Sequence, residues 1–343
     1  MKKIIAFALA AVMALSMVAC GGETKTETAD VTYKVGMGIY MEQSASHATA
    51  DKAGKAEIIA TVALITLDEE GKIVKADIDV ADTTSKIDAA GVATVDSDLR
   101  TKMEKGADYG MKSDWGSKIG EWNEQIEAFE NWMVGKTVTE VAEMELGANG
   151  AGRTDTPVAE DLKATTTISM SSMLMAVKEA TENAVEVKNV ATVGLGSVVE
   201  ATATSATADK AGKAGFTSTW AGVALDAEGK ILFATIDCAD QTMNFDTTGK
   251  VTEYADLKTK GDKGTDYGMK SDWGSKIGEW YEQVDAFETW MVGKTVTEVA
   301  EMELGENGAG RTDTPVDADL KATTTISMSS FLLAIAQAGE EAK

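Results

Sequence analysis

Apolar and polar positions along the chain follow two different periods, which together predict a mixture of strands and helices. Residues Glu57–Leu67 are apolar and β-branched, and Glu69–Gly71 form a turn. Over Lys72–Val80, apolar and polar side chains then alternate. This pattern predicts a β-hairpin. A leading strand is expected around Val35–Gly38, and a shorter hairpin around Ile87–Thr94.

A helical period follows the strands. It predicts a helix over about residues 117–134, because apolar side chains recur there on one face. That face consists of Trp122, Ile126, Phe129 and Met133. Thr137 and Glu140 form a capping box that opens a short second helix. A β-prone run at Thr165–Ser169 then precedes a closing helix over Ser171–Ala180. These elements predict an α+β fold.

The whole pattern occurs twice along the chain. Four segments, DKAGKA, DYGMKSDWGSKIGEW, MVGKTVTEVAEMELG and DLKATTTISMSS, begin at Asp51, Asp108, Met133 and Asp161 and again at Asp209, Asp266, Met291 and Asp319. Each recurrence lies 158 residues further along, so no insertion separates the copies. We predict two tandem domains, residues 32–189 and 190–343, each with an antiparallel sheet and packed helices and each long enough to fold alone.

The amino-terminal residues predict export and lipid anchoring. Lys2 and Lys3 precede an uncharged apolar run, Ile4–Met17, which is too short for a comfortable membrane-spanning helix. The run ends at Ala19-Cys20, as expected for a lipoprotein signal peptide over residues 1–19. We therefore expect lipidation of Cys20, a polar tether over residues 20–31, and an extracytoplasmic protein held on the cell membrane.

Composition narrows the possible chemistry. The formal net charge is −24, so the chain repels nucleic acid, and we expect no nucleic-acid partner. His47 is the only histidine, which excludes a Ser-His-Asp triad in each copy and any multi-histidine metal site. Cys238 is the only cysteine after Cys20, and we expect it to be a small buried apolar residue. Any redox or group-transfer chemistry must therefore come from a bound cofactor.

The segment Asp161–Ser169, DLKATTTIS, and its twin Asp319–Ser327 carry the most specific signal. An Asp is followed after six residues by a Thr, then by Ile-Ser and a closing helix. With the repeated YGMK and IGEW segments, this order resembles the FMN-binding domain family, including the two-domain flavin-bearing lipoproteins of Gram-positive extracellular electron transfer. The resemblance implies FMN joined through a phosphodiester to a threonine hydroxyl, installed by a flavin transferase.

Carried over by position, the resemblance implies that Thr167 and Thr325 are the acceptors and that Asp161 and Asp319 are the motif's acidic residues. The family has Ser-Gly-Ala before the acceptor, whereas this chain has Ala164-Thr165-Thr166. Thr165 and Thr166 therefore remain alternative acceptors.

Two further pairs of residues are candidates for cofactor binding. Trp115 and Trp273 stand between a charged turn and a glycine, where an indole could stack on the flavin ring. Packing in the core or on the surface is the alternative. Arg153 and Arg311 lie in acidic loops and could meet the flavin phosphate, or form a loop ion pair.

The expected function is that of a surface-tethered redox carrier rather than a free-standing enzyme, with no metal. Two covalent FMN groups would take electrons from a membrane donor, a quinol or a dehydrogenase, and pass them to extracellular acceptors. The alternative is a non-catalytic ligand-binding or structural surface lipoprotein without flavin. Asp79, Asp82, Asp237 and Asp240, which alternate along two strands, are expected to form solvated strand faces.

Overall fold

The computed structural model describes residues 30–342 except 151 and 308–309. The expected signal peptide, Cys20 and nearly all of the expected tether lie outside the described residues. Residues from Val31 onward form one compact unit. The two copies are described below within that unit.

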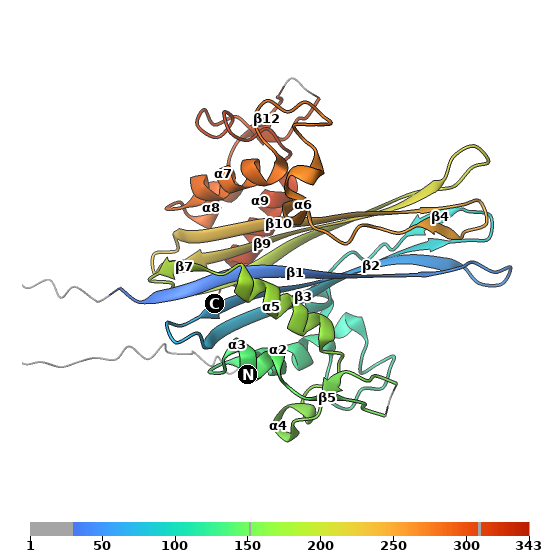
Figure 1. Ribbon diagram of the computed structural model, residues 1–343, viewed down its shortest axis with the longest axis horizontal. Coiled ribbons are helices and arrows are strands. Elements are labelled where there is room, and N and C mark those ends of the chain that lie inside the picture. Colours follow the sequence, from blue (N-terminus) through green and yellow to red (C-terminus); the bar gives the residue numbers. More distant parts are fainter. Residues whose placement is uncertain (1–29, 151, 308–309, 343) are drawn as a thin grey trace, which may run out of the picture. The chain divides into compact units, whose positions relative to one another are not determined.

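Each copy is built on an antiparallel sheet (Figure 1). The first sheet has the order β4-β3-β2-β1-β7 and the second has the order β11-β10-β9-β8. The strands are β1 (Thr32–Ser46), β2 (Gly54–Leu67), β3 (Ile73–Ile87), β4 (Ala93–Val95), β7 (Val185–Lys188), β8 (Thr192–Thr204), β9 (Gly212–Leu225), β10 (Ile231–Phe245) and β11 (Val251–Glu253). The leading strand and both expected hairpins are present. The edge strand β7, which pairs with β1, was not predicted.

The helices come in the same order in both copies, except that a turn at residues 318–323 takes the place of α4 in the second copy. The first copy has α1 (Lys102–Lys105), η1 (Gly106–Tyr109), α2 (Trp122–Met133), α3 (Val138–Ala142), α4 (Glu160–Lys163) and α5 (Ser171–Glu182). The second has α6 (Lys260–Lys263), η2 (Gly264–Tyr267), α7 (Trp280–Met291), α8 (Val296–Ala300) and α9 (Ser329–Glu341). Two-residue strands form small pairs beside them: β5 (Leu146–Gly147) with β6 (Thr156–Pro157), and β12 (Leu304–Gly305) with β13 (Thr314–Pro315). The α+β prediction is confirmed.

Two predicted elements were wrong in detail. Helix α2 begins at Trp122 instead of about Ser117, because Glu121 and Glu124 close a capping box at its start. The β-prone run Thr165–Ser169 is a turn and loop and not a strand. The backbone amides of Thr165 and Thr166 both donate to the Leu162 carbonyl at the end of α4. These two hydrogen bonds form a turn, so the amides are not available to a neighbouring strand. Tertiary contacts override the β propensity of threonine here.

The outer face of each sheet packs against helices. In the first copy, this core joins Ala63, Ile65 and Ile78 of the sheet to residues of α2 and α5. Glycines allow the close approach of α5 to β1. A Cβ on Gly36 would lie 2.2 Å from the Ala180 carbonyl oxygen, and one on Gly38 would lie 2.3 Å from the Ala180 nitrogen. The matching glycines Gly194 and Gly196 serve α9 in the second copy.

The inner faces of the two sheets pack against each other. One buried cluster contains Met37, Val62 and Leu64 of the first copy together with Trp220 and Ala224 of the second. Figure 1 shows the resulting order of layers, in which the helices of the two copies lie on opposite sides of the paired sheets. The copies therefore have separate outer cores and a shared inner core. Independent folding of residues 32–189 and 190–343 stays a prediction.

Within the residues that the structure describes, none of the helices combines the length and apolar character needed to cross a membrane.

Candidate functional site

The threonine triplet of each copy lies in the loop between α4 or its counterpart and the closing helix. Thr166 is fully buried, and its hydroxyl donates to the Gln125 carbonyl at 3.0 Å. The Thr165 hydroxyl donates to the Leu162 carbonyl at 3.1 Å. The Thr167 hydroxyl is half-buried and donates to Gln125 Oε1 at 3.1 Å, beside the Thr167 amide at 2.8 Å. The second copy repeats this pattern with Thr323, Thr324, Thr325 and Gln283.

Side chains from a neighbouring loop fix the chain on both sides of Thr167. Asn149 Nδ2 donates to the Thr167 carbonyl at 3.2 Å, and Arg153 Nη1 donates to Ser169 Oγ at 3.0 Å. Arg311 makes the same contact with Ser327 at 2.8 Å. The expected loop arginines therefore reach the segment that follows the expected acceptors.

A pocket lies directly beside this segment in each copy. The pocket of the first copy has a volume of about 240 Å³, and its floor is the outer face of the sheet. Its lining residues are Glu42, Ile59, Thr61, Val80, Lys102, Tyr109, Met111, Trp115, Trp122, Arg153, Ile168, Ser169, Ser172 and Met173. The pocket of the second copy, about 190 Å³, is lined by residues 158 positions further along. We call them the first and the second pocket.

Aromatic rings form one side of each pocket. Trp122 is buried, whereas Trp115 is 63% exposed and stands at the edge. The Trp115 ring meets Tyr109 edge-on with 5.2 Å between centroids, and Trp273 and Tyr267 repeat that geometry. Trp115 and Trp273 are therefore pocket residues with a free indole surface, as a stacking role requires.

A lysine that the sequence did not single out also lines each pocket. Lys102 Nζ lies 3.3 Å from Asp82 Oδ2 and 5.3 Å from the centre of the Tyr109 ring. Lys260 repeats these contacts with Asp240, at 3.0 Å, and with Tyr267. Burial by itself lowers the pKa of Lys260, but the surrounding groups, Asp240 among them, outweigh it and raise the pKa overall. Each pocket therefore holds two cationic groups, one lysine and one arginine.

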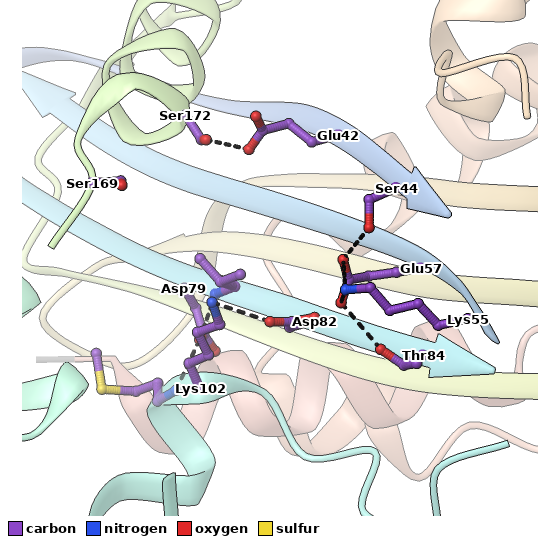
Figure 2. A network of polar contacts seen from close by, with 12 residues as sticks. Glu42, Ser44, Lys55, Glu57, Asp79, Asp82, Thr84, Lys102, Ser169 and Ser172 are labelled. Atoms are coloured by element: carbon purple, nitrogen blue, oxygen red, sulfur yellow. Dashed lines mark hydrogen bonds and ion pairs between the residues drawn. The ribbon is translucent and has the colours of Figure 1, made fainter. Parts of the chain in front are cut away.

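Figure 2 shows this arrangement on the sheet of the first copy. Glu42 accepts a hydrogen bond from Ser172 at the start of α5, and Asp82 pairs with Lys102 across the same face. Ser169, which Figure 2 also labels, lines the pocket two residues after Thr167. The polar groups that line the pocket thus come from two strands, β1 and β2, from α1, η1 and α5, and from the loops that hold Arg153 and Ser169.

The expected acidic residues are not part of the pockets. Asp161 accepts a hydrogen bond from Trp132 Nε1 at 3.0 Å, and Trp132 stacks on Phe129. Asp319 lies in the corresponding turn, where its amide donates to Asp317. Neither Asp161 nor Asp319 lines either of these two pockets.

The expectation of solvated strand faces was wrong for two of the four aspartates. Asp79 Oδ1 accepts hydrogen bonds from the amides of Val80 and Met103, and it thereby holds the start of α1 against the sheet. Burial raises its pKa to about 6. Asp237 does the same for α6 through the amides of Cys238 and Gly261. Alternation along a strand did not reveal these long-range partners.

A larger cavity of about 350 Å³ lies where the copies meet, next to β3, α1, α2 and α9. Most of its polar lining is carboxylate, including Asp77, Asp79, Glu104, Glu127 and Glu130. Such a lining opposes an anionic ligand. In the described part of the chain, no group of His, Cys, Asp and Glu side chains is arranged to hold a metal ion.

The paired pockets are therefore the best-defined candidate site. Lys102, Tyr109 and Gln125 were missed from sequence, although each lies in a segment that recurs 158 residues later as Lys260, Tyr267 and Gln283. Searches of protein-family models, curated proteins and solved structures found no match to this chain, so its function has to be argued from the pockets themselves.

Proposed function

We propose that the protein is a surface-tethered electron carrier that holds one FMN on Thr167 and one on Thr325 through phosphodiester bonds. The observation that carries the proposal is the position of each threonine. Each of the two threonines is followed directly by an Ile-Ser pair that lines a pocket of aromatic and cationic side chains. The resemblance to FMN-binding domains, found in the same residues, supports it.

The cationic groups fit a phosphate near the threonine. Arg153 lines the pocket and donates to Ser169, two residues beyond Thr167, so a cationic group lies near the segment that a phosphodiester on Thr167 would join. Arg311 and Ser327 repeat the fit. In a chain with a net charge of −24, such a local cationic group is needed to balance an added phosphate.

The aromatic groups fit a planar ring at the other end. The exposed Trp115 and its neighbour Tyr109 provide surfaces for stacking. Both pockets are smaller than the roughly 300–1,000 Å³ typical of sites that enclose a whole ligand. We therefore expect the ring to enter only in part, which leaves an edge exposed for electron exchange with partners. FMN itself supplies the redox chemistry, because it accepts and releases one or two electrons.

The backbone supports Thr167 over its two neighbours as acceptor. The Thr166 hydroxyl is fully buried against α2, and that of Thr165 caps the turn after α4. The glycine that the family has at position 165 is not required here. Among the described non-glycine residues only Asn189 has a positive φ, so Thr165 has an ordinary conformation. The same holds for Thr323.

Flavin attachment is tested by expressing the exported chain with and without a flavin transferase. We expect fluorescence in the denatured protein band and an intact mass that shows two FMN groups, only when the transferase is present. Thr167→Ala should lose one group, and the double variant with Thr325→Ala should lose both. Thr165→Ala is the matched control and should keep both. A wild-type band without fluorescence, made with an active transferase, would leave a ligand-binding or structural lipoprotein as the function.

Lipid anchoring is the second part of the proposal, and it rests on the sequence around Cys20. The anchor would keep the carrier on the outer face of the membrane, within reach of a quinol or dehydrogenase as donor and of soluble extracellular acceptors. Cys20→Ala should leave the protein unprocessed or shed into the medium. Membrane association of that variant at the wild-type level, measured by fractionation, would contradict the anchor.

A further inference from the structure

The first and second pockets are alike at most lining positions and differ at three. Ile59, Val80 and Met173 of the first pocket are replaced by Thr217, Cys238 and Phe331 in the second. The remaining lining residues, the lysine, the arginine and the tryptophans among them, are identical. The two pockets can therefore be compared, within one chain, as two versions of the same site.

Two of the three differences bring polar hydrogens into the second pocket. Ile59 and Val80 offer only hydrocarbon, whereas Thr217 brings a hydroxyl and Cys238 a thiol. The Thr217 hydroxyl donates to Asp240 Oδ1 at 3.4 Å, so it acts on the pocket through the carboxylate that pairs with Lys260. Thr219 Oγ1 donates to Cys238 Sγ at 3.7 Å, so the thiol acts there as an acceptor and its own hydrogen is not used in that contact. Burial raises the pKa of Cys238 to about 11, so the group is a neutral thiol near pH 7 and can donate.

The charge around each pocket differs in the same direction. Lys102 is paired with Asp82, whose side chain is 26% exposed, and Lys260 is paired with Asp240, whose side chain is 41% exposed. The Lys260–Asp240 pair is the shorter of the two, at 3.0 Å against 3.3 Å, but Asp240 also accepts a hydrogen bond from Thr217, for which Ile59 offers no counterpart in the first pocket. The first copy also has Glu57 on the pocket face of the sheet, bonded to Lys55 and Ser44 (Figure 2), where the second has Gly215.

These differences act on the charge that a redox cofactor gains. Reduction adds electron density to a flavin ring. Hydrogen-bond donors and cations stabilise that added density, whereas an apolar wall or a nearby carboxylate such as Glu57 does not. Both kinds of difference favour the reduced ring in the second pocket.

We infer that the two pockets hold the same ring at unequal reduction potentials, with the second the more easily reduced and with Cys238 and Thr217 as the residues that set the difference. The inference rests on the proposed function. Electrons would therefore pass from the ring in the first pocket, which is oxidised, to the ring in the second pocket, which is reduced. The order of the two copies along the chain then gives electron flow a direction.

The test uses full-length chains that carry one flavin each. Thr325→Ala leaves only the first pocket loaded, and Thr167→Ala leaves only the second. Both are titrated spectroscopically against redox dyes. At the solution potential where the first is half reduced, we expect the second to show a reduced-to-oxidised ratio about tenfold higher, the effect of one ordinary hydrogen bond.

Exchanged residues test the cause. Thr217→Ile with Cys238→Val, placed in the Thr167→Ala chain, should lower the potential of the second pocket to near that of the first. Ile59→Thr with Val80→Cys, in the Thr325→Ala chain, should raise the potential of the first. The single variant Cys238→Val, which copies the first pocket, serves if the double variant does not fold.

The outcomes separate the two levels of the proposal. Loaded chains with equal potentials, with the opposite order, or with potentials that the exchanges do not move would overturn the inference while leaving the carrier function intact. A wild-type chain without covalent flavin would overturn both.

Discussion

Adjacent threonines in the two loops have different roles that chemical type alone does not distinguish. Thr166 is fully buried and bonded to the backbone of α2, whereas the Thr167 hydroxyl is half-buried and bonded to the Gln125 side chain. The first is a structural residue, and the second is the one that we propose as the site of modification. Gln125 therefore links the position of the loop to that of the helix.

The division of roles predicts a separation of effects. Thr166→Val keeps the shape of the side chain but removes its hydrogen bond, so the free energy of unfolding should fall by about 1 kcal/mol while flavin content is unchanged. Thr167→Ala should lose the flavin of its copy with little loss of stability. Chemical denaturation and in-gel fluorescence measure the two. Thr165→Val, at the exposed position, should change stability by less than about 0.5 kcal/mol. Equal destabilisation by all three would refute the assignment.

Site residues could be predicted from the sequence when their motif is local, but not when their contact partners are distant in the sequence. Thr167, Arg153 and Trp115 belong to short segments with recognisable local character, and the structure brings Arg153 and Trp115 into the pocket beside the Thr167 loop. Lys102 meets Asp82 across a sheet and a helix, and Asp79 holds the amide of Met103. Such contacts join residues about 20 positions or more apart, and no local pattern encodes them.

At the scale of elements, the closing helices α5 and α9 each accept a hydrogen bond from a strand amide, one through a carboxylate and the other through a side-chain amide. Gln337 on α9 accepts from the Ser197 amide at 2.7 Å and donates to Glu104 Oε1 at 2.8 Å. Its counterpart on α5 is Glu179, which accepts from the amide of Ile39 and faces the carboxylates of Asp262, Asp237 and Glu182. Burial, reinforced by these like charges, raises the pKa of Glu179 to about 7.

This substitution predicts a pH dependence. The pKa of Glu179 is higher in the folded chain than its ordinary value of 4.5, so the folded state binds more protons between those pH values. Its contribution to stability is therefore present below about pH 4.5 and is lost as pH rises to about 7. Glu179→Gln should match the wild type near pH 5 and be more stable at pH 8, in denaturant titrations at both pH values. Gln337→Glu should show the reverse. Identical pH profiles for wild type and Glu179→Gln would rule out the protonated contact.

Periodicity predicted elements well where the chain is buried on one face and poorly where other contacts decide. The β2–β3 hairpin and the α3 capping box follow directly from local spacing. Thr165–Ser169 has the composition of a strand, but it has no partner strand, and the end of α4 turns it into a loop. The edge strand β7 was missed because a four-residue segment carries too little pattern.

For the whole molecule, the doubling of the fold was evident from sequence, but the packing of the copies was not. The run from Ala60 to Leu67 is apolar except for Thr61 and Thr66, and apolar residues on both faces are a feature of strands that are buried on both sides. The structure supplies the reason. Even-numbered and odd-numbered residues of β2 pack on the other sheet and on the helices, respectively.

The shared inner core shapes what separation of the copies should do. Fragments 30–189 and 190–343 each retain an outer core, so we expect each to unfold cooperatively. Each would also expose its inner face, including Val62 in one and Trp220 in the other, so we expect the fragments to associate with each other or with themselves. Denaturant titration and sizing by ultracentrifugation measure both. A fragment without a cooperative transition would show that folding requires the whole pair.

The face-to-face packing of the sheets also turns the two pockets away from each other, since each opens on the outer side of its own sheet. For an electron carrier, this means that the site that receives electrons and the site that gives them up would lie on opposite sides, with two layers of strands between them. A bulky donor docked at one site does not obstruct an acceptor at the other. Under the proposed function, the protein would not have to release its donor before it binds its acceptor, and electrons would pass through it between two partners bound at the same time.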